Sequence, residues 1–318
     1  MTQPASQEDF QHISVLLQEA VDALVHQPQG HYLDGTFGRG GHSRAILQSL
    51  HPEGRLYAFD KDPQAFTQAQ KLHSQDARLY PIQDSFAQMQ THLHQITGQA
   101  HAQLDGILLD LGVSSPQLDD PERGFSFLHD GPLDMRMNPD VGESAAQWIA
   151  RASATEIADV LYHYGEERFS RRMAKAIVEA RQQAPITRTQ TLAEIIKAAN
   201  PAWEKGKHPA TRAFQGIRIY INRELDDLKE ALQAAITCLK PGGRLVVISF
   251  HSLEDRIVKR FMRDLSRGDT HLPVGIPLTQ DQLQCDLKLL SKAIRPSAQE
   301  VAANPRARSA VMRVAQRL

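Results

Sequence analysis

Apolar and polar positions follow two different rhythms along the first 111 residues. Short apolar runs at residues 31–34, 55–60, 78–82 and 106–111 predict strands, and residues 43–50 and 63–74 have the spacing of helices. The run from 106 to 111 is apolar without interruption, as is typical of a strand covered on both faces. Strands that alternate with helices predict an α/β domain with a parallel sheet.

The rhythm changes after residue 111. Residues 119–140 are rich in Asp, Pro, Gly and Met and predict a loop, whereas residues 144–199 predict helices with no strand between them. The strand pattern returns at 244–250, and residues 309–315 are a candidate last strand. We therefore expect a sheet domain made of residues 1–118 and 216–318, interrupted by an inserted all-helical domain, residues 119–215, that recognises the substrate.

Composition excludes several classes of protein. The chain is 41% hydrophobic and 23% charged, which is an ordinary globular balance, and we find no apolar run of the roughly 20 residues that a membrane span needs. Its polar first ten residues lack the features of a secretory signal. The two cysteines, Cys238 and Cys285, form no CxxC motif, and the histidines show no metal-binding spacing. We expect a cytoplasmic protein without a disulfide framework, a metal or a membrane part.

Charge is divided unevenly along the chain. Residues 1–150 hold 8 Lys and Arg against 19 Asp and Glu, whereas residues 151–318 hold 28 against 18. Basic side chains gather in four segments, 168–175, 205–212, 256–267 and 306–317, and those of the third segment recur at helical spacing. The split is either a chance distribution of solvated faces or a surface for nucleic acid phosphates, supplied mostly by the second half.

A glycine-rich turn follows the first predicted strand and reads Asp34-Gly-Thr-Phe-Gly-Arg-Gly-Gly-His-Ser43. Glycines at such a turn, here Gly38, Gly40 and Gly41, let the backbone approach a ligand closely. The third glycine of the dinucleotide pattern G-x-G-x-x-G is missing, and Asp34 would repel a pyrophosphate. The turn favours a ligand with a cationic amine, such as S-adenosylmethionine. His42 is expected to shape this cofactor site.

Two further residues fit the same cofactor. Asp60 ends the second predicted strand, 22 positions after Gly38, where a carboxylate can accept both hydroxyls of a ribose. Phe86 follows the third predicted strand and is a candidate to stack on adenine. The alternative for Asp60 is a solvated loop acid, and the alternative for Phe86 is an ordinary core side chain.

Candidate catalytic residues follow the fourth predicted strand, in the segment Asp110-Leu-Gly-Val-Ser-Ser-Pro-Gln117. Enzymes that methylate amines commonly carry a short [DNS]-P-P-[YFW] loop there. Acceptors on the two hydrogens of an exocyclic amine favour tetrahedral geometry at its nitrogen and align it with the methyl group. Asp110, Ser114 and Ser115 are candidates, and Pro116 retains one proline of the loop. The second proline and the aromatic residue are absent, so a plain Ser-Pro turn is the alternative.

His251 follows the strand at 244–250 and is a candidate to face the substrate. The next residues, Ser252, Glu254 and Asp255, make a good helix start, and that structural role requires no catalysis.

Six long motifs of the chain together resemble the bacterial RsmH/MraW family of 16S ribosomal RNA cytosine-N4 methyltransferases. They are Asp34–Ser43, Gly106–Asp119, Glu122–Phe127, Gly131–Met137, Ser249–Arg256 and Asn304–Ser309. The resemblance implies a class I (Rossmann-like) fold with an inserted helical domain. It also implies S-adenosylmethionine-dependent methylation of a cytosine in the decoding region of the small ribosomal subunit. The family's cofactor contacts fall on Gly40, Gly41, His42, Asp60, Phe86, Asp110 and Gln117, so Asp110 has two candidate roles, toward the cofactor and toward the target amine.

Two other functions stay open at this point. A methyltransferase of small molecules is disfavoured by the basic clusters and the large insertion, and binding to ribosomal particles would discriminate. A non-catalytic ribosome-assembly factor is disfavoured by the intact glycine turn and Asp60, and measurable cofactor binding would exclude it. A cytosine-C5 enzyme is also disfavoured, because neither Cys238 nor Cys285 follows a strand in a Pro-Cys motif. The sequence leaves open the oligomeric state, any general base, and whether free or assembled rRNA is the substrate.

Overall fold

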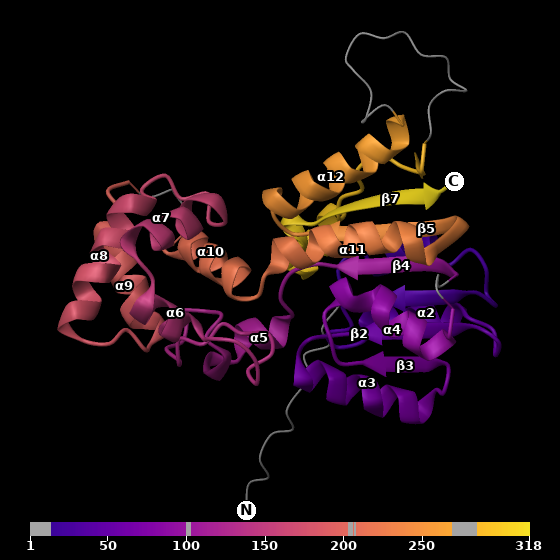
Figure 1. The fold of residues 1–318 in the computed structure, drawn as a ribbon, viewed down its shortest axis with the longest axis horizontal. Coiled ribbons are helices and arrows are strands. Elements are labelled where there is room, and N and C mark those ends of the chain that lie inside the picture. Colours follow the sequence, from indigo (N-terminus) through magenta and orange to yellow (C-terminus); the bar gives the residue numbers. More distant parts are fainter. Residues whose placement is uncertain (1–13, 100–102, 203–205, 207, 269–284) are drawn as a thin grey trace, which may run out of the picture.

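A computed structural model of the chain describes residues 14–99, 103–202, 206, 208–268 and 285–318, and it shows a sheet domain beside a separate helical unit (Figure 1). The sheet has the strand order β3-β2-β1-β4-β5-β7-β6. Its strands are β1 (His31–Asp34), β2 (Arg55–Phe59), β3 (Leu79–Ile82), β4 (Leu104–Asp110), β5 (Leu239–Ser249), β6 (Leu287–Leu289) and β7 (Val311–Arg317).

The strands β1 to β5 are paired in parallel, and β7 is antiparallel to both of its neighbours. The chain runs outward from β1 to β3 on one side and from β4 to β5 on the other. The carboxyl ends of β1 and β4 therefore flank a topological switch point, where open α/β sheets form a ligand crevice.

Helices cover both faces of the sheet. One core gathers side chains from α1 (Leu17–Leu24), α2 (Gly41–Ser49) and α3 (Pro63–Gln75), and the other from α4 (Met89–Thr97), α11 (Glu224–Cys238) and α12 (Ser252–Arg267). In β5, Leu245 and Val247 enter one core, while Val246 and Ile248 enter the other. This two-sided burial explains the uninterrupted apolar runs at β4 and β5.

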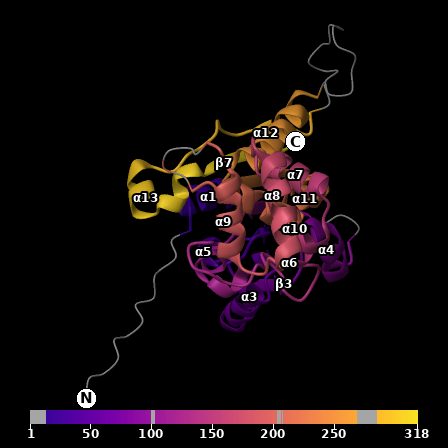
Figure 2. The same ribbon diagram turned by 90° about the vertical axis from the view of Figure 1, so that its left-hand side faces the viewer.

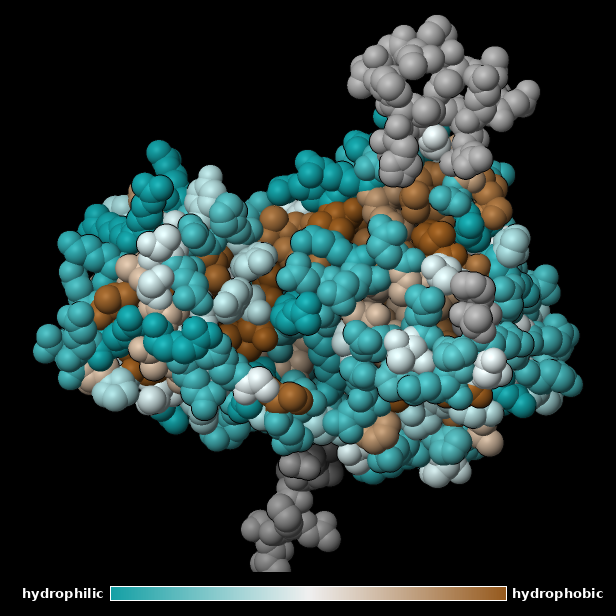
Figure 3. All heavy atoms as spheres, in the orientation of Figure 1, coloured by the Kyte–Doolittle hydropathy of each residue, from teal (hydrophilic) through white to brown (hydrophobic). Residues whose placement is uncertain are grey.

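The outer helices do not bury all of their apolar surface. Apolar atoms form a band over the region of α11 and α12 in Figure 3. Partly buried apolar side chains of these helices pack against the adjacent core, namely Ile236, Ile257, Phe261 and Leu265. The C-terminal part adds α13 (Ala298–Ala303) and the 3-10 turn η4 (Pro305–Ser309), and η1 (Phe86–Gln88) precedes α4.

The helical unit has a core of its own, which contains Trp148 fully buried. Its helices are α6 (Ala145–Arg151), α7 (Ala154–His163), α8 (Ser170–Gln183), α9 (Thr189–Ala199) and α10 (Thr211–Ile221), and they lie in front of the sheet domain in Figure 2. The short helix α5 (Ser115–Asp119) and the turn η2 (Pro121–Arg123) lead into it. A Cβ added to Gly216 would lie 2.7 Å from the Gly165 nitrogen, so α10 meets the end of α7 at backbone contact.

The predicted strands are confirmed to within a few residues, as are the first two predicted helices and the helical character of the insertion. Helices α1 and α4 and the three-residue strand β6 were not predicted. The predicted domain division between residues 215 and 216 falls within α10, where Phe214 and Ile217 share the helical core. The division of the chain and the role of residues 119–215 in recognition stay predictions. Among the described residues, no helix is long and apolar enough to cross a membrane.

Candidate active site

A cavity of about 540 Å³ opens at the carboxyl edge of the sheet, between the sheet domain and the helical unit. Most of the residues predicted for the site line it: Gly38, Gly41, His42, Asp60, Phe86, Asp110, Ser114, Ser115, Gln117 and His251. Asp34, Gly40 and Pro116 belong to the same segments but do not line the cavity. The sheet topology thus brings together candidates from five strand ends.

The glycine turn connects β1 with α2. Gly38 and Gly40 have φ values of 55° and 76°, in the left-handed region that favours glycine. Asp34 is 1% exposed, and its carboxylate accepts hydrogen bonds from the Thr36 nitrogen (3.1 Å) and from Ser43 Oγ (2.6 Å). In this structure Asp34 connects the glycine turn to α2 and does not line the cavity. Its contact with a cofactor stays a prediction.

Asp60, which follows β2, contacts the glycine turn at Gly38. Its Oδ2 accepts a hydrogen bond from the Gly38 nitrogen (2.7 Å), and its Oδ1 accepts one from the Asp62 nitrogen (2.9 Å). Burial raises the pKa of Asp60 to about 6, against the lowering effect of these two hydrogen bonds, and the charges of Asp62 and Asp34 raise it further. A carboxylate held beside the glycine turn at this strand end can accept ribose hydroxyls.

Cofactor affinity is therefore expected to fall as the pH drops through about 6, because a protonated Asp60 loses acceptor capacity toward the ribose. Single-proton linkage limits the fall to about tenfold per pH unit. Calorimetry between pH 5 and pH 7 measures this fall in affinity.

Substitutions of Asp60 test the same contact. Asp60→Asn should flatten the pH profile of cofactor affinity. Asp60→Ala should weaken cofactor binding about tenfold to several hundredfold through the loss of two hydrogen bonds to a charged group. An unchanged pH profile in Asp60→Asn would remove Asp60 from the cofactor site.

Asp110 ends β4 with one carboxylate oxygen uncommitted. Its Oδ2 lies 3.5 Å from His42 Nδ1, and its backbone nitrogen donates to Thr36 Oγ1 (2.7 Å). Its Oδ1 is buried and has no hydrogen-bond partner among the described residues. Burial, together with the charges of Asp34 and Glu254, raises the pKa of Asp110 well above its ordinary value. A buried acceptor of this kind calls for a donor from a bound molecule, such as an ammonium or an aromatic amine.

The loop after β4 turns into the short helix α5. Ser114 is its N-cap residue, and the Ser114 nitrogen donates to Gln117 Oε1 (2.9 Å). Pro116 lies in the first turn, where its fixed φ is compatible with a helix. Gln117 Nε2 donates to Asp62 Oδ2 (2.8 Å), so both polar atoms of this side chain hold the loop in place. Ser114 and Ser115 line the cavity from this loop.

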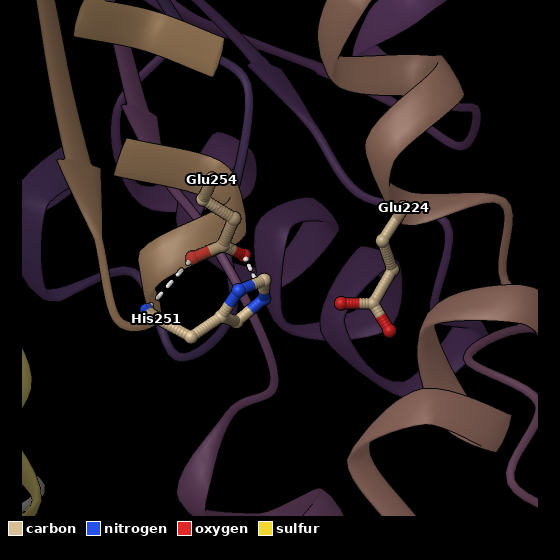
Figure 4. Close-up of side chains that lie close together, drawn as sticks. All are labelled: Glu224, His251 and Glu254. Carbon is tan, nitrogen blue, oxygen red and sulfur yellow. Dashed lines mark hydrogen bonds and ion pairs between the residues drawn. The ribbon is translucent and has the colours of Figure 1, made fainter. Parts of the chain in front are cut away.

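His251 lies between two glutamates (Figure 4). Its Nε2 is 3.1 Å from Glu254 Oε1, while Glu254 Oε2 accepts hydrogen bonds from the backbone nitrogens of Phe250 (2.9 Å) and His251 (3.3 Å). The expected structural role of Glu254 at the start of α12 is thus confirmed. Ligand atoms of Glu224, His251 and Glu254 lie within 4.8 Å of one another. Both oxygens of Glu224, however, accept hydrogen bonds from Arg218 (2.8 and 2.9 Å), and this neighbouring cation favours an ion-pair network over a metal site.

The cavity has lining residues that the sequence analysis missed. Met137, Thr211, Gln215 and Arg218 come from the helical unit, and Asn304, Arg306 and Ser309 come from the C-terminal part. Met137 and the last three belong to motifs quoted above, whereas Thr211, Gln215 and Arg218 of α10 carry no signal beyond ordinary helix periodicity. Neither cysteine lines the cavity: Cys238 is fully buried in α11, where burial raises its pKa to about 11. The basic residues Lys205 and Lys207 lie outside the described residues.

Comparisons with known proteins identify the family of the chain. The model of a family described as the MraW methylase family matches residues 9–318. The chain is 62% identical to the ribosomal RNA small subunit methyltransferase H of Chromohalobacter salexigens, over 98% of this chain and 92% of that protein. It is 59% identical to the protein of the same name from a Marinomonas species, over 97% of each. Among solved structures, an rRNA methylase from Streptococcus thermophilus is similar at 11% identity and a TM-score of 0.40, over 94% of this chain and 92% of that one.

Proposed function

The chain belongs to the MraW methylase family, and we propose that it methylates the exocyclic N4 of a specific cytosine in the decoding region of 16S ribosomal RNA. Its cofactor is S-adenosylmethionine, which carries a methyl group on a sulfonium sulfur. An amine nitrogen can attack this methyl group, and the sulfur then leaves as a neutral thioether. The observation that carries the proposal is the uncommitted, buried Asp110 Oδ1 in a cavity that also holds the glycine turn and Asp60.

The residues of the cavity fit the parts of this cofactor. Asp60 would accept the ribose hydroxyls beside the turn of Gly38, Gly41 and His42, and Phe86 would pack against the adenine. Gly40, Gly41, His42, Asp60, Phe86, Asp110 and Gln117 are the contacts that the family resemblance implies. Asp34 and Gly40 would act from outside the cavity by fixing the turn.

Amine methylation explains why polar acceptors gather after β4. The nitrogen of an exocyclic amine shares its lone pair with the ring. Acceptors that bind its hydrogens make this lone pair more available to attack the methyl group. Asp110, Ser114 and Ser115 can supply such acceptors from one loop, and Pro116 stiffens it. A mechanism at cytosine C5 needs a cysteine nucleophile, and Cys238, with its raised pKa, lies in the core instead.

The substrate side of the proposal rests on charge. The relatives named above are small-subunit rRNA methyltransferases, and the first helix after β5 presents exposed basic side chains. On α12 these are Arg256, Lys259, Arg260, Arg263 and Arg267, and the first of them pairs with Glu166 of the helical unit (3.2 Å). A phosphate backbone that follows α12 would thus run toward the mouth of the cavity. With ribosomal RNA as the substrate, we propose that the reaction takes place in the cytoplasm.

The proposal is tested by methyl transfer from labelled cofactor to purified small subunits and to naked 16S rRNA, followed by identification of the modified nucleoside. N4-methylated cytidine at one position is the expected product. Label at carbon 5, at a ribose oxygen or in a small molecule would overturn the proposal. Comparison of the two RNA substrates shows whether the assembled subunit is required.

Reversal of charge on α12 is expected to weaken RNA binding without changing cofactor affinity. Lys259→Glu with Arg260→Glu removes two exposed cations, and each lost phosphate contact should lower the salt slope of binding by about 0.7–0.9. Lys71→Glu with Lys229→Glu makes the same change of net charge on α3 and α11 and is the matched control. Equal salt slopes for both double variants would mean that this face of α12 is only solvated surface.

A further inference from the structure

Two motifs of the family resemblance have no part in the proposed chemistry, and they pack against each other. They are the segments Glu122–Phe127 and Gly131–Met137. The Met135 nitrogen donates to the Arg123 carbonyl oxygen (3.1 Å), and a Cβ on Gly124 would lie 2.2 Å from the carbonyl oxygen of Pro132. Met135 itself has a φ of 64°, a conformation that a side chain other than glycine rarely adopts. The two segments therefore form one tightly packed bracket at the entrance to the helical unit.

The side chain of Arg123 links this bracket to the sheet domain. It is about nine-tenths buried, and its Nη1 donates to Asp62 Oδ2 (2.7 Å). Its Nη2 donates to the carbonyl oxygens of Met137 (2.8 Å) and Arg136 (3.2 Å). A planar guanidinium can make these contacts in two directions at once, whereas a lysine ammonium is a single point charge on a flexible stem.

Asp62 contacts both the loop of Ser114 and Ser115, through Gln117, and the candidate ribose-binding residue Asp60. Its Oδ2 accepts a second hydrogen bond from Gln117 Nε2 (2.8 Å), and Gln117 in turn holds the Ser114 nitrogen (2.9 Å). Its Oδ1 caps α3, and its backbone nitrogen donates to Asp60 Oδ1 (2.9 Å). A single residue thus joins the ribose-binding side, through its backbone nitrogen, to the catalytic loop, through its carboxylate.

The far end of the bracket reaches the chain where it leaves the helical unit. The Met137 nitrogen donates to Asn222 Oδ1 (2.6 Å), and Asn222 Nδ2 donates to the Met135 carbonyl oxygen (2.7 Å). Lys61 Nζ donates to the Asn222 carbonyl oxygen (3.0 Å), which returns the network to the residue beside Asp62. The polar network therefore closes around the base of the helical unit, and Arg123 lies at its centre.

We propose that Arg123 is a positioning residue for methyl transfer: it holds Asp62 and, through Gln117, fixes the loop of Ser114 and Ser115 relative to the cofactor. This inference rests on the proposed amine methylation. Arg123 does not line the cavity, so it acts only through the residues that it holds. A loop displaced by about an ångström costs transfer rate while the cofactor residues before it stay in place.

The test compares Arg123→Lys with the unmodified enzyme in single turnovers at saturating cofactor and RNA. The rate is expected to fall about 10- to 100-fold, with the dissociation constant of the cofactor changed by less than about threefold. Arg136→Lys is the matched control, because Arg136 forms a comparable paired contact with Asp134 (2.7 Å) whose side chain lies outside this network. Its rate should stay within about twofold of the parent rate.

A purely structural role would give a different pattern. Arg123→Lys would then lower the melting temperature, but below that temperature its single-turnover rate would equal the parent rate, and this result would overturn the proposal. If Arg123→Lys does not fold, Asp62→Asn provides the same readout, because its amide presents hydrogens to both Arg123 and Gln117. In the double variant the two losses should not add, since both changes break one network.

Failure of this inference can be told apart from failure of the proposed function. The rates are compared on whichever nucleoside the parent enzyme methylates, so an unexpected product leaves the comparison of Arg123→Lys with Arg136→Lys intact. Conversely, N4-methylated cytidine formed at the full rate by Arg123→Lys would leave the function standing and remove Arg123 from its machinery.

Discussion

Removal of the helical unit, with Asp120 joined directly to Arg223, is expected to leave a protein that binds S-adenosylmethionine but methylates no ribosomal RNA. The two cores that flank the sheet contain none of the described residues of the helical unit, so the sheet domain keeps its packing. The candidate cofactor contacts also lie outside the unit. The deletion removes Arg123 and the cavity-lining residues Met137, Thr211, Gln215 and Arg218, whereas the basic side chains of α12 remain. Loss of positioning should lower turnover by at least about a thousandfold.

Folding of the deletion variant must be established before its activity is interpreted. Circular dichroism and calorimetric titration with the cofactor serve this purpose, because a binding site built from four strand ends forms only in a folded sheet. Glu224 loses its partner Arg218 in this variant, and Glu224→Gln in the same background removes the charge left behind. A folded deletion variant that methylates rRNA at close to the parent rate would show that recognition lies in the sheet domain.

The parallel strands of the sheet could be predicted because they carry a strong signal, whereas the antiparallel pairing of β7 was not predicted. Parallel strands buried on both faces read as continuous apolar runs, and β4 and β5 stand out for this reason. The interruption by helices was equally readable, since the helical unit buries its own core around residues such as Trp148. Strand β6, with three residues and one buried side chain, lacks such a pattern. The predicted boundary at residue 215 lies within α10, whose helix continues to Ile221, and the division into domains stays a prediction.

The sequence predicted which residues belong to the candidate site, but it did not predict what each of them contacts. Residues that follow strands, such as Asp60 and Asp110, could be assigned to one edge from topology alone. Sequence could not tell that both oxygens of Asp34 would be used by Thr36 and Ser43, because this depends on how the turn folds back on α2. It also assigned Arg123 no role, because its partner Asp62 lies 61 positions away in the chain.

Of Asp34 and Asp110, Asp110 is the better candidate to accept a hydrogen bond from an amine of the cofactor or of the target base. Both carboxylate oxygens of Asp34 accept hydrogen bonds from the turn and α2, whereas Asp110 has a buried oxygen at the cavity for which the described part of the chain supplies no hydrogen-bond partner. An acceptor on the target amine acts mainly in the transition state, while an acceptor on the cofactor's ammonium acts mainly on binding. The two roles therefore predict different kinetic results for the same substitution.

Asp110→Ala is expected to lower the single-turnover rate at saturating cofactor by about 10²–10³-fold, the loss typical of one preorganised transition-state contact. Cofactor affinity should change by less, about threefold, since Asp60 and the glycine turn remain. Asp110→Asn keeps one carbonyl oxygen as an acceptor and should lose less rate than Asp110→Ala. Rates come from rapid-quench assays with labelled cofactor, and affinities from calorimetry on the same preparations. If the dissociation constant rises a hundredfold while the rate at saturation stays at the parent value, the carboxylate of Asp110 binds the cofactor's amine, and the acceptors for the target amine must be sought at Ser114 and Ser115.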